Sequence, residues 1–350
     1  MTTLDDVTSL THAGSLLSAQ GRITASYDLE VSDAAIAEYR ALSASDGIHN
    51  ANTSTGTIRY DGASRAHIIN GMGVTLGDSI VGLTALAAVQ HRYPGISFSI
   101  YRPARTPLFV KTLYQLAAPL FGTVLDLPVP LDALPPNEPK VDVGNHLFWP
   151  NFSTMPMIDF FLWALGLEPA DIALQEKSNG WLKQLGLPDL PREWKGRPYI
   201  LLAPTASTPV RSIPSRYLPG IVSRLWAEFR LPIVGSLPIE HEHYINISTH
   251  SQSTASYLSW VRGSTLLVTS DTSALHVGAG FDVPTAAFFT TIPSTLRARD
   301  YPKCAAIDFP IPALTGIHAS ARPADLALVE RAYSELDRID WIGALRARTA

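Results

Sequence analysis

The stretch SDTSALHVGAGFDVPTAAFF, residues 270–289, reads as a strand end, a turn, a short helix and the next strand. A short apolar run precedes it, and Asp271 stands where a carboxylate can cap the first turn of a helix. Unpaired backbone N–H groups and the helix dipole at such a turn also favour a bound phosphate. Thr272 and His276 are four residues apart and share a helix face. The stretch therefore predicts a strand–turn–helix–strand unit with an anion-binding turn.

The same alternation of strand and helix continues on both sides of this stretch. Strands are predicted at 66–70, 96–101, 122–129, 199–203, 231–235, 265–268, 284–290 and 304–309. Helices are predicted after the glycine-rich residues 71–78 and at 107–121, 158–165, 215–229, 254–261 and 322–336. Strands and helices that take turns in this way are typical of doubly wound parallel sheets. The predicted fold class is therefore α/β.

The length of 350 residues suits two domains better than one. The segment LPDLPREWKGRP, residues 187–198, combines prolines, charges and a glycine, and is the best candidate for a linker. We predict an N-terminal extension of unclear role at 1–65, with one helix at 32–42, then an acceptor domain at 66–190 and a donor domain at 191–350. The last helix could pack back on the acceptor domain. Two such domains would hold a ligand between them, at the carboxyl ends of their strands.

Composition and charge narrow the classes of function. A net charge of −4 gives no reason to expect nucleic-acid binding. The single cysteine, Cys304, excludes an internal disulfide and a cysteine-cluster metal site. The first residues are acidic where a secretory signal is basic, and no apolar run is long enough to span a bilayer. We expect a cytoplasmic protein, and leave open peripheral contact with the inner face of the membrane.

The glycine-rich turn after the first α/β strand, Gly71, Gly73 and Gly77, matches neither a dinucleotide fingerprint nor a phosphate-binding P-loop. Two interpretations remain for it. The turn is merely flexible and Asp78 caps the next helix, or the glycines let an acceptor approach the backbone while Asp78 acts as a general base.

In the second half, Arg211 follows the first strand of the donor domain, where a guanidinium can bind a diphosphate. Glu240 or Glu242 could bind a ribose. Each of these charged residues also fits a solvated surface position, and His276 also fits a hydrogen-bonded helix histidine. We predict no metal site at His241 and His243, because no third ligand has a convincing spacing.

Two of these motifs, in this order, resemble glycosyltransferase family 9, the bacterial heptosyltransferases. They are GDSIVGLTALAAVQHRYPGISFSI, residues 77–100, and the opening stretch 270–289. The resemblance runs from about residue 66 to residue 350. It implies the GT-B fold, two Rossmann-like doubly wound domains that face a central cleft. It also implies an inverting enzyme of lipopolysaccharide biosynthesis or a related pathway, which needs neither a metal nor another cofactor.

The resemblance implies roles for individual residues. Asp78 matches the family's catalytic base, and Asp271, Thr272 and Ser273 match its donor-phosphate turn. The remaining donor-binding matches are His276, Arg211 and, for the nucleoside, Glu240. Three features depart from the family pattern: Ser273 replaces a glycine, Arg211 replaces a lysine, and FFTTIPS at 288–294 replaces a glycine-containing turn.

The expected reaction moves a sugar from a nucleoside diphosphate sugar to a hydroxyl group of an acceptor, and the resemblance implies heptose as the sugar and ADP-heptose as the donor. That acceptor is a glycan, a lipopolysaccharide core or a protein. Two alternatives stay open: a nucleotide-sugar epimerase, and a non-catalytic GT-B-like binding subunit. Product analysis with the donor alone separates the epimerase, because only an epimerase changes the sugar without an acceptor.

Overall fold

The computed structural model describes residues 3–32 and 38–349. They form two compact units, one ending at Lys177 and one beginning at Ser178. Residues 178–190, which the sequence grouped with the first domain, pack with the second unit. They do so through the short helix η7 (Gly180–Gln184), which contacts α8 (Ser273–Gly280) and buries Trp181. None of the helices in the described part of the chain is long and apolar enough to cross a membrane.

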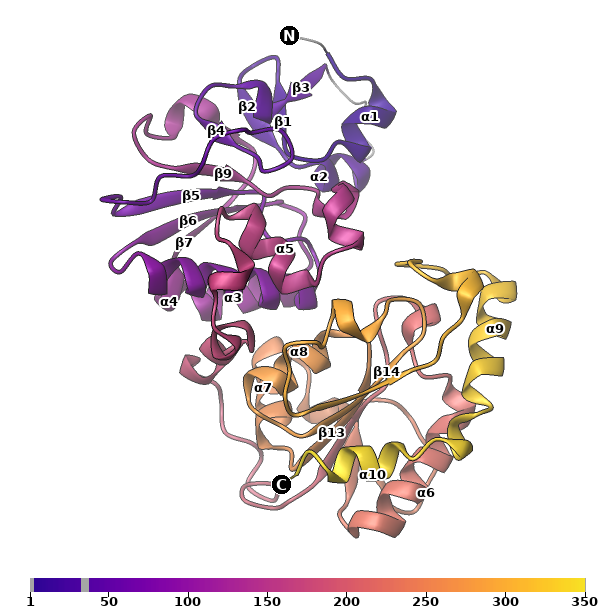
Figure 1. The fold of residues 1–350 in the computed structure, drawn as a ribbon. Helices are drawn as coiled ribbons and strands as arrows, with labels where there is room; N and C mark the ends of the chain where they lie inside the picture. The colour runs from indigo at the N-terminus through magenta and orange to yellow at the C-terminus, as the bar shows by residue number, and fades with distance from the viewer. Residues whose placement is uncertain (1–2, 33–37, 350) are drawn as a thin grey trace. The chain divides into compact units, whose positions relative to one another are not determined.

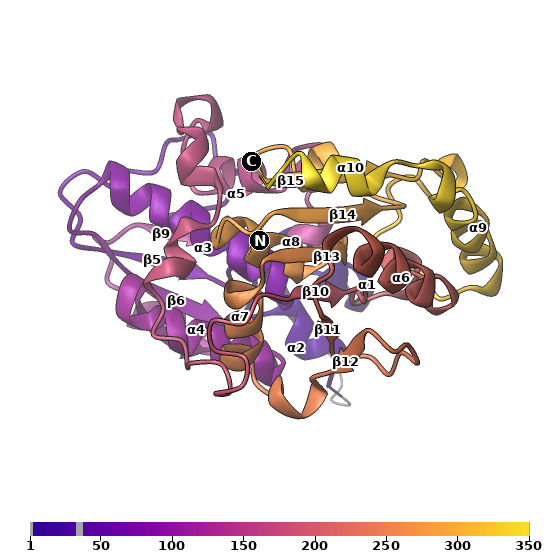
Figure 2. The ribbon, with the colours of Figure 1, turned by 90° about the horizontal axis from the view of Figure 1, so that it is seen from below.

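The second unit is built on a six-stranded parallel sheet. Its strands are β10 (Ile200–Ala203), β11 (Ile233–Gly235), β12 (Tyr244–Asn246), β13 (Leu266–Ser270), β14 (Thr285–Phe289) and β15 (Cys304–Asp308). They lie in the order β12-β11-β10-β13-β14-β15, which can be followed in Figure 2. This is the doubly wound order, in which the direction of winding reverses between β10 and β13. The strands predicted from the sequence are confirmed, and only β12 was missed.

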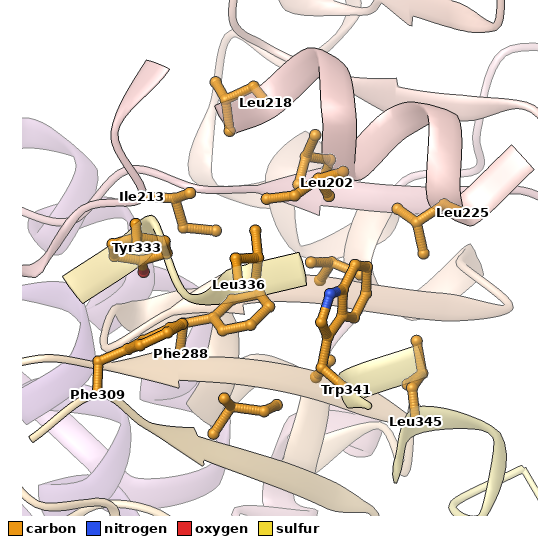
Figure 3. Packing of buried hydrophobic residues seen from close by; sticks show 14 of the residues in the cluster. Leu202, Ile213, Leu218, Leu225, Phe288, Phe309, Tyr333, Leu336, Trp341 and Leu345 are labelled. Atoms are coloured by element: carbon orange, nitrogen blue, oxygen red, sulfur yellow. The ribbon is translucent and has the colours of Figure 1, made fainter. Parts of the chain in front are cut away.

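Both faces of this sheet are buried. Ala286 and Phe288 of β14 enter one core, and the intervening Ala287 enters another with Leu275 of α8. Helices α6 (Leu218–Phe229), α9 (Pro323–Tyr333) and α10 (Trp341–Arg346) contribute to the first core, where Trp341 and Tyr333 lie near Phe288 (Figure 3). Burial on both faces explains the nearly continuous apolar run in β14. Helix α10, which the sequence analysis did not predict, packs on β14, β15 and α6. The contact of the last predicted helix, α9, with the acceptor domain stays a prediction.

The first unit contains a five-stranded parallel sheet in the order β4-β9-β5-β6-β7. Its strands are β4 (Ile48–His49), β5 (Arg65–Ile69), β6 (Ser97–Arg102), β7 (Gly122–Asp126) and β9 (Lys140–Asp142). The accompanying helices are α3 (Leu76–Arg92), α4 (Leu108–Phe121) and α5 (Met157–Ala164) (Figure 1). Winding reverses here between β5 and β9, so this sheet has its own switch point.

The N-terminal residues belong to the first unit. Strands β1 (Leu16–Ser18), β2 (Arg22–Thr24), β3 (Tyr39–Ala41) and β8 (Val129–Pro130) form an antiparallel sheet in the order β3-β1-β2-β8. Its buried side chains share a core with Ile69 of β5 and Tyr101 of β6. Of the helix predicted at 32–42, residues 33–37 lie outside the described residues. The prediction is wrong for 39–41, because this segment pairs with β1 as a strand.

Candidate functional site

A cavity of about 240 Å³ lies at the switch point of the second sheet. Its walls include Thr205 after β10, Ser236 and Leu237 after β11, and Thr272 and Ser273 after β13. All are at the carboxyl ends of parallel strands, where doubly wound sheets bind their ligands. The cavity therefore occupies the position at which this architecture most often holds a nucleotide.

Helix α8 begins at this cavity. Its N-cap is Thr272, whose side chain makes no capping hydrogen bond. The prediction that Asp271 caps the helix is wrong, because Asp271 lies one residue earlier and its carboxylate accepts a hydrogen bond from Arg211 Nη1 at 3.0 Å. The first-turn N–H groups of α8 thus have no capping side chain and are suited to bind an anion.

Arg211 lies beside this helix terminus, in the short helix η8 (Pro209–Arg211) that follows β10. Its Nη2 donates to Ser207 Oγ at 3.0 Å, while Nε has no hydrogen-bond partner among the described residues. Asp271, whose side chain is only 4% exposed, fixes the guanidinium and partly neutralises it. A diphosphate at α8 would share Arg211 with Asp271.

Of the six predicted donor-site residues, only Thr272 and Ser273 line the cavity; Arg211, Asp271, Glu240 and His276 do not. Glu240 is exposed in the loop between β11 and β12, where Glu242 is exposed as well. His276 is buried in α8, where its Nδ1 is 2.7 Å from the hydroxyl oxygen of Tyr301. Asn179 Nδ2 donates to the carbonyl oxygen of His276 at 2.9 Å. The hydrogen-bonded helix histidine is therefore the interpretation that fits the geometry of His276.

The sequence reasoning missed two aromatic residues of the cavity wall, Tyr257 and Trp260 of helix α7 (Thr254–Gly263). Burial raises the pKa of Tyr257 to about 12, and a hydrogen bond with Ser273 acts in the opposite direction. The spacing of the two aromatics puts them on one face of the predicted helix, but that pattern does not distinguish a cavity wall from a core.

The glycine-rich turn of the first unit follows β5, at the switch point next to β9. Gly71 and Gly73 lie in this turn, whereas Gly77 is already in the first turn of α3. Thr75 caps α3, and its Oγ1 accepts from the N–H of Asp78 at 3.3 Å. The interpretation of Asp78 as a helix cap is therefore wrong, because the helix begins two residues before it.

The carboxylate of Asp78 faces His146, a residue that the sequence reasoning missed. Asp78 Oδ2 lies 3.4 Å from Nε2 of His146, and the two side chains are 17% and 2% exposed. Gly73 has a φ of +73°, and a Cβ there would lie 2.5 Å from His146 Cε1 and 3.0 Å from Asp78 Oδ2. Glycine at this position gives the backbone its left-handed conformation and leaves room for the pair.

A second basic residue near Asp78 is Arg102, at the carboxyl end of β6. Its Nη1 donates to the carbonyl oxygen of Gly71 and, at 3.1 Å, to the hydroxyl of Tyr114. Burial lowers the pKa of Arg102, and the charges of nearby groups, Asp78 among them, act in the opposite direction.

N-terminal residues form hydrogen bonds with the turn after β9, in which His146 lies. Asp142, at the end of β9, accepts from the N–H and the Oγ of Ser15 at 2.8 and 2.6 Å, and from the N–H of Gly144 at 3.0 Å. Burial raises the pKa of Asp142, and these hydrogen bonds act in the opposite direction. Asn145 donates to the carbonyl oxygens of Leu10 and His12. Residues 10–15 therefore help to fix the backbone on which His146 stands.

Comparison with known proteins agrees with this architecture. No family model and no curated protein matches the sequence. Among solved structures, a glycosyltransferase of family 9 from Veillonella parvula DSM 2008 is similar with a TM-score of 0.50 and 13% identity, over 84% of this chain and 99% of that one. ADP-heptose heptosyltransferase II from E. coli gives 0.47 and 16%, over 78% and 99%. The E. coli heptosyltransferase WaaC with ADP gives 0.43 and 12%, over 78% and 98%.

The similarity to the Veillonella protein extends over both units, and both parallel sheets are doubly wound, as the sequence predicted. At this level of identity the comparison establishes the fold. The structure of this chain thus resembles that of a family 9 glycosyltransferase, and its fold is the predicted α/β fold of the GT-B type.

Proposed function

We propose that this chain is an inverting, metal-independent glycosyltransferase that moves a sugar from a nucleoside diphosphate sugar to a hydroxyl group. The observation that carries this proposal is the cavity at the switch point of the second sheet, into which the uncapped N-terminus of α8 opens through Thr272 and Ser273. Its volume of about 240 Å³ is below the ~300–1,000 Å³ of pockets that enclose a whole drug-sized ligand. The cavity would hold the nucleoside, and the diphosphate would lie at the helix terminus.

The reaction assigns one step to each unit. An acceptor hydroxyl loses its proton to Asp78 while its oxygen bonds to the anomeric carbon. The bond from that carbon to the diphosphate breaks, and the nucleoside diphosphate leaves with the electron pair. The base contributes a factor of ~10²–10⁴. Negative charge grows on the leaving diphosphate, so Arg211 and the first N–H groups of α8 would stabilise the transition state more than the ground state.

The donor and the acceptor are proposed from the sequence motifs. ADP-heptose is the first donor to test, and a glycan, a lipopolysaccharide core or a protein is the acceptor. Glu240 and His276 keep their proposed donor role only if substitution changes nucleotide affinity, since neither lines the cavity in this structure.

Calorimetric titration of the purified chain with ADP, GDP, UDP and TDP tests the proposal. We expect one of the four to bind clearly more tightly than the others, because a nucleoside cavity discriminates between bases. Ser236→Phe should abolish this binding by filling the cavity, whereas Ser248→Phe, at an exposed position outside it, should not. If none of the four nucleotides binds, the proposed function is wrong.

A second assay separates transfer from epimerisation. Incubation with the preferred nucleotide sugar alone should release the nucleoside diphosphate slowly, with water as the acceptor, and leave the remaining donor sugar unchanged. A donor whose sugar changes configuration would identify an epimerase instead.

A further inference from the structure

His146 combines burial with unused hydrogen-bonding capacity. Its side chain is 2% exposed, and neither ring nitrogen has a hydrogen-bond partner among the residues that the structure describes. Leaving such a group unpaired in the interior costs about 1–3 kcal/mol, so a buried orphan of this kind requires an explanation. The carboxylate that pairs with the ring within 4 Å in the described chain is that of Asp78.

The surroundings of the ring fix its direction. Phe152 and Phe161 meet it edge-on, with ring centroids 4.6 and 5.2 Å away. Gly73 closes the side of Cε1, where even a methyl group would collide. The ring therefore has little freedom to turn, and its Nε2 stays directed at Asp78, the more exposed member of the pair. A substrate would reach Asp78 first, so that His146 would act through Asp78.

We infer that His146 is a positioning residue for Asp78: its Nε2, 3.4 Å from Asp78 Oδ2, orients the carboxylate that takes the acceptor's proton. This inference rests on the proposed function, in which Asp78 is the general base.

Other titratable groups lie on the elements that surround Asp78 and His146, and they also act on the electrostatics of this pair. Arg102 at the end of β6 interacts electrostatically with Asp78. The hydroxyl of Tyr114 of α4 accepts a hydrogen bond from Arg102, whose guanidinium also lies over the Tyr114 ring. Asp142 precedes His146 on the β9 turn and interacts electrostatically with His12 of the N-terminal segment. Of these groups Asp78 makes the ion pair with His146, so its removal should have the largest effect on the imidazole.

An NMR titration of the free protein tests the pairing without any turnover. The Cε1–H signal of His146, assigned by its loss in His146→Gln, is followed with pH in the wild type and in Asp78→Asn. We expect the titration of this signal to differ between the two proteins, because Asp78→Asn replaces the carboxylate that lies 3.4 Å from Nε2. An unchanged pKa in a variant with otherwise native chemical shifts overturns the inference.

The effect on the base is measured by release of nucleoside diphosphate from the nucleotide sugar, with water as the acceptor. His146→Gln keeps an N–H donor without the charge, and His146→Leu removes both. We expect the acidic limb of the pH–rate profile to move up in His146→Leu, because the ionised carboxylate loses a hydrogen-bond donor, and to move less in His146→Gln. At the pH optimum, kcat should fall at least tenfold in His146→Leu and less in His146→Gln, with an unchanged KM for the donor.

His49→Gln is the matched control, because His49 is a half-buried histidine of the same unit on β4. It should leave the acidic limb in place. If the limb also stays in place in both His146 variants, His146 is merely structural and the inference is overturned. If the wild type releases no nucleoside diphosphate at all, the proposed function fails, while the NMR titration still decides whether His146 and Asp78 are paired.

Discussion

Replacement of Gly73 by alanine would perturb the Asp78–His146 pair directly. The residue has a φ of +73°, so any side chain costs about 1–2 kcal/mol of backbone strain. The new Cβ would also lie 2.5 Å from Cε1 of a ring that Phe152 and Phe161 hold in place. Overpacking of this kind adds about 1–3 kcal/mol. We expect Gly73→Ala to lower the free energy of unfolding of the first unit by about 2–5 kcal/mol in total.

Gly62 provides the matched control. It has the same φ of +73°, but an added Cβ would have no other atom within 4 Å. Gly62→Ala should therefore cost only the backbone term, about 1–2 kcal/mol. Native-state hydrogen exchange of the β5 and β9 amides measures the stability of the first unit in both variants. Equal losses of stability would refute the steric argument. Gly73→Ala should also slow release of the nucleoside diphosphate at least tenfold without weakening nucleotide binding.

Three further outcomes are expected. Arg211→Ala should weaken binding of the preferred nucleoside diphosphate by about 10–100-fold, since hydrogen bonds to charged groups contribute about 1.5–3 kcal/mol. Calorimetry measures this affinity. The control is Arg216→Ala, which replaces an exposed arginine of the same loop region and should leave the affinity unchanged. His276→Ala should lower the free energy of unfolding of the second unit by about 1–3 kcal/mol. Calorimetry should find the nucleotide affinity of this variant within about twofold of the wild type. A large loss of affinity would show instead that His276 takes part in donor binding. Burial lowers the pKa of His12 and of His49 below the ordinary 6.5, so the folded state resists their protonation and the first unit loses stability as the pH falls below 6.5. Urea unfolding at about pH 7.5 and about pH 5.5 should show this loss, and the double variant His12→Gln/His49→Gln should show less of it.

The long, regular elements could be predicted because their own residues carry the signal. Strand β6 alternates polar and apolar side chains, β14 is a nearly continuous apolar run, and α4 has the spacing of an amphipathic helix. The three residues of β9 carry no such signal, because they are Lys140, Val141 and Asp142. They form a strand because β4 and β5 pair with them on both sides. That information is in the rest of the fold and not in the segment.

The same limit explains which site residues could be found. Asp78 could be recognised from its place after a glycine-rich turn. His146 could not, because it reaches Asp78 only through the adjacency of β5 and β9, and β9 was not predicted. At α8 the sequence predicted the right turn but placed the cap one residue early, because Asp271 and Thr272 are both good capping residues. Only the salt bridge with Arg211 distinguishes them.

The hydrogen bonds from Ser15 to Asp142 have a consequence for biosynthesis. Their partners are 127 residues apart in the chain. At a translation rate of about 5–20 residues per second, Ser15 leaves the ribosome roughly 6–25 s before Asp142 does. During that interval the antiparallel sheet also lacks β8, so the N-terminal strands have no complete surface on which to pack. The nascent N-terminal segment is therefore expected to be a binding site for chaperones and a target for proteases until β9 has emerged and Ser15 can bind Asp142.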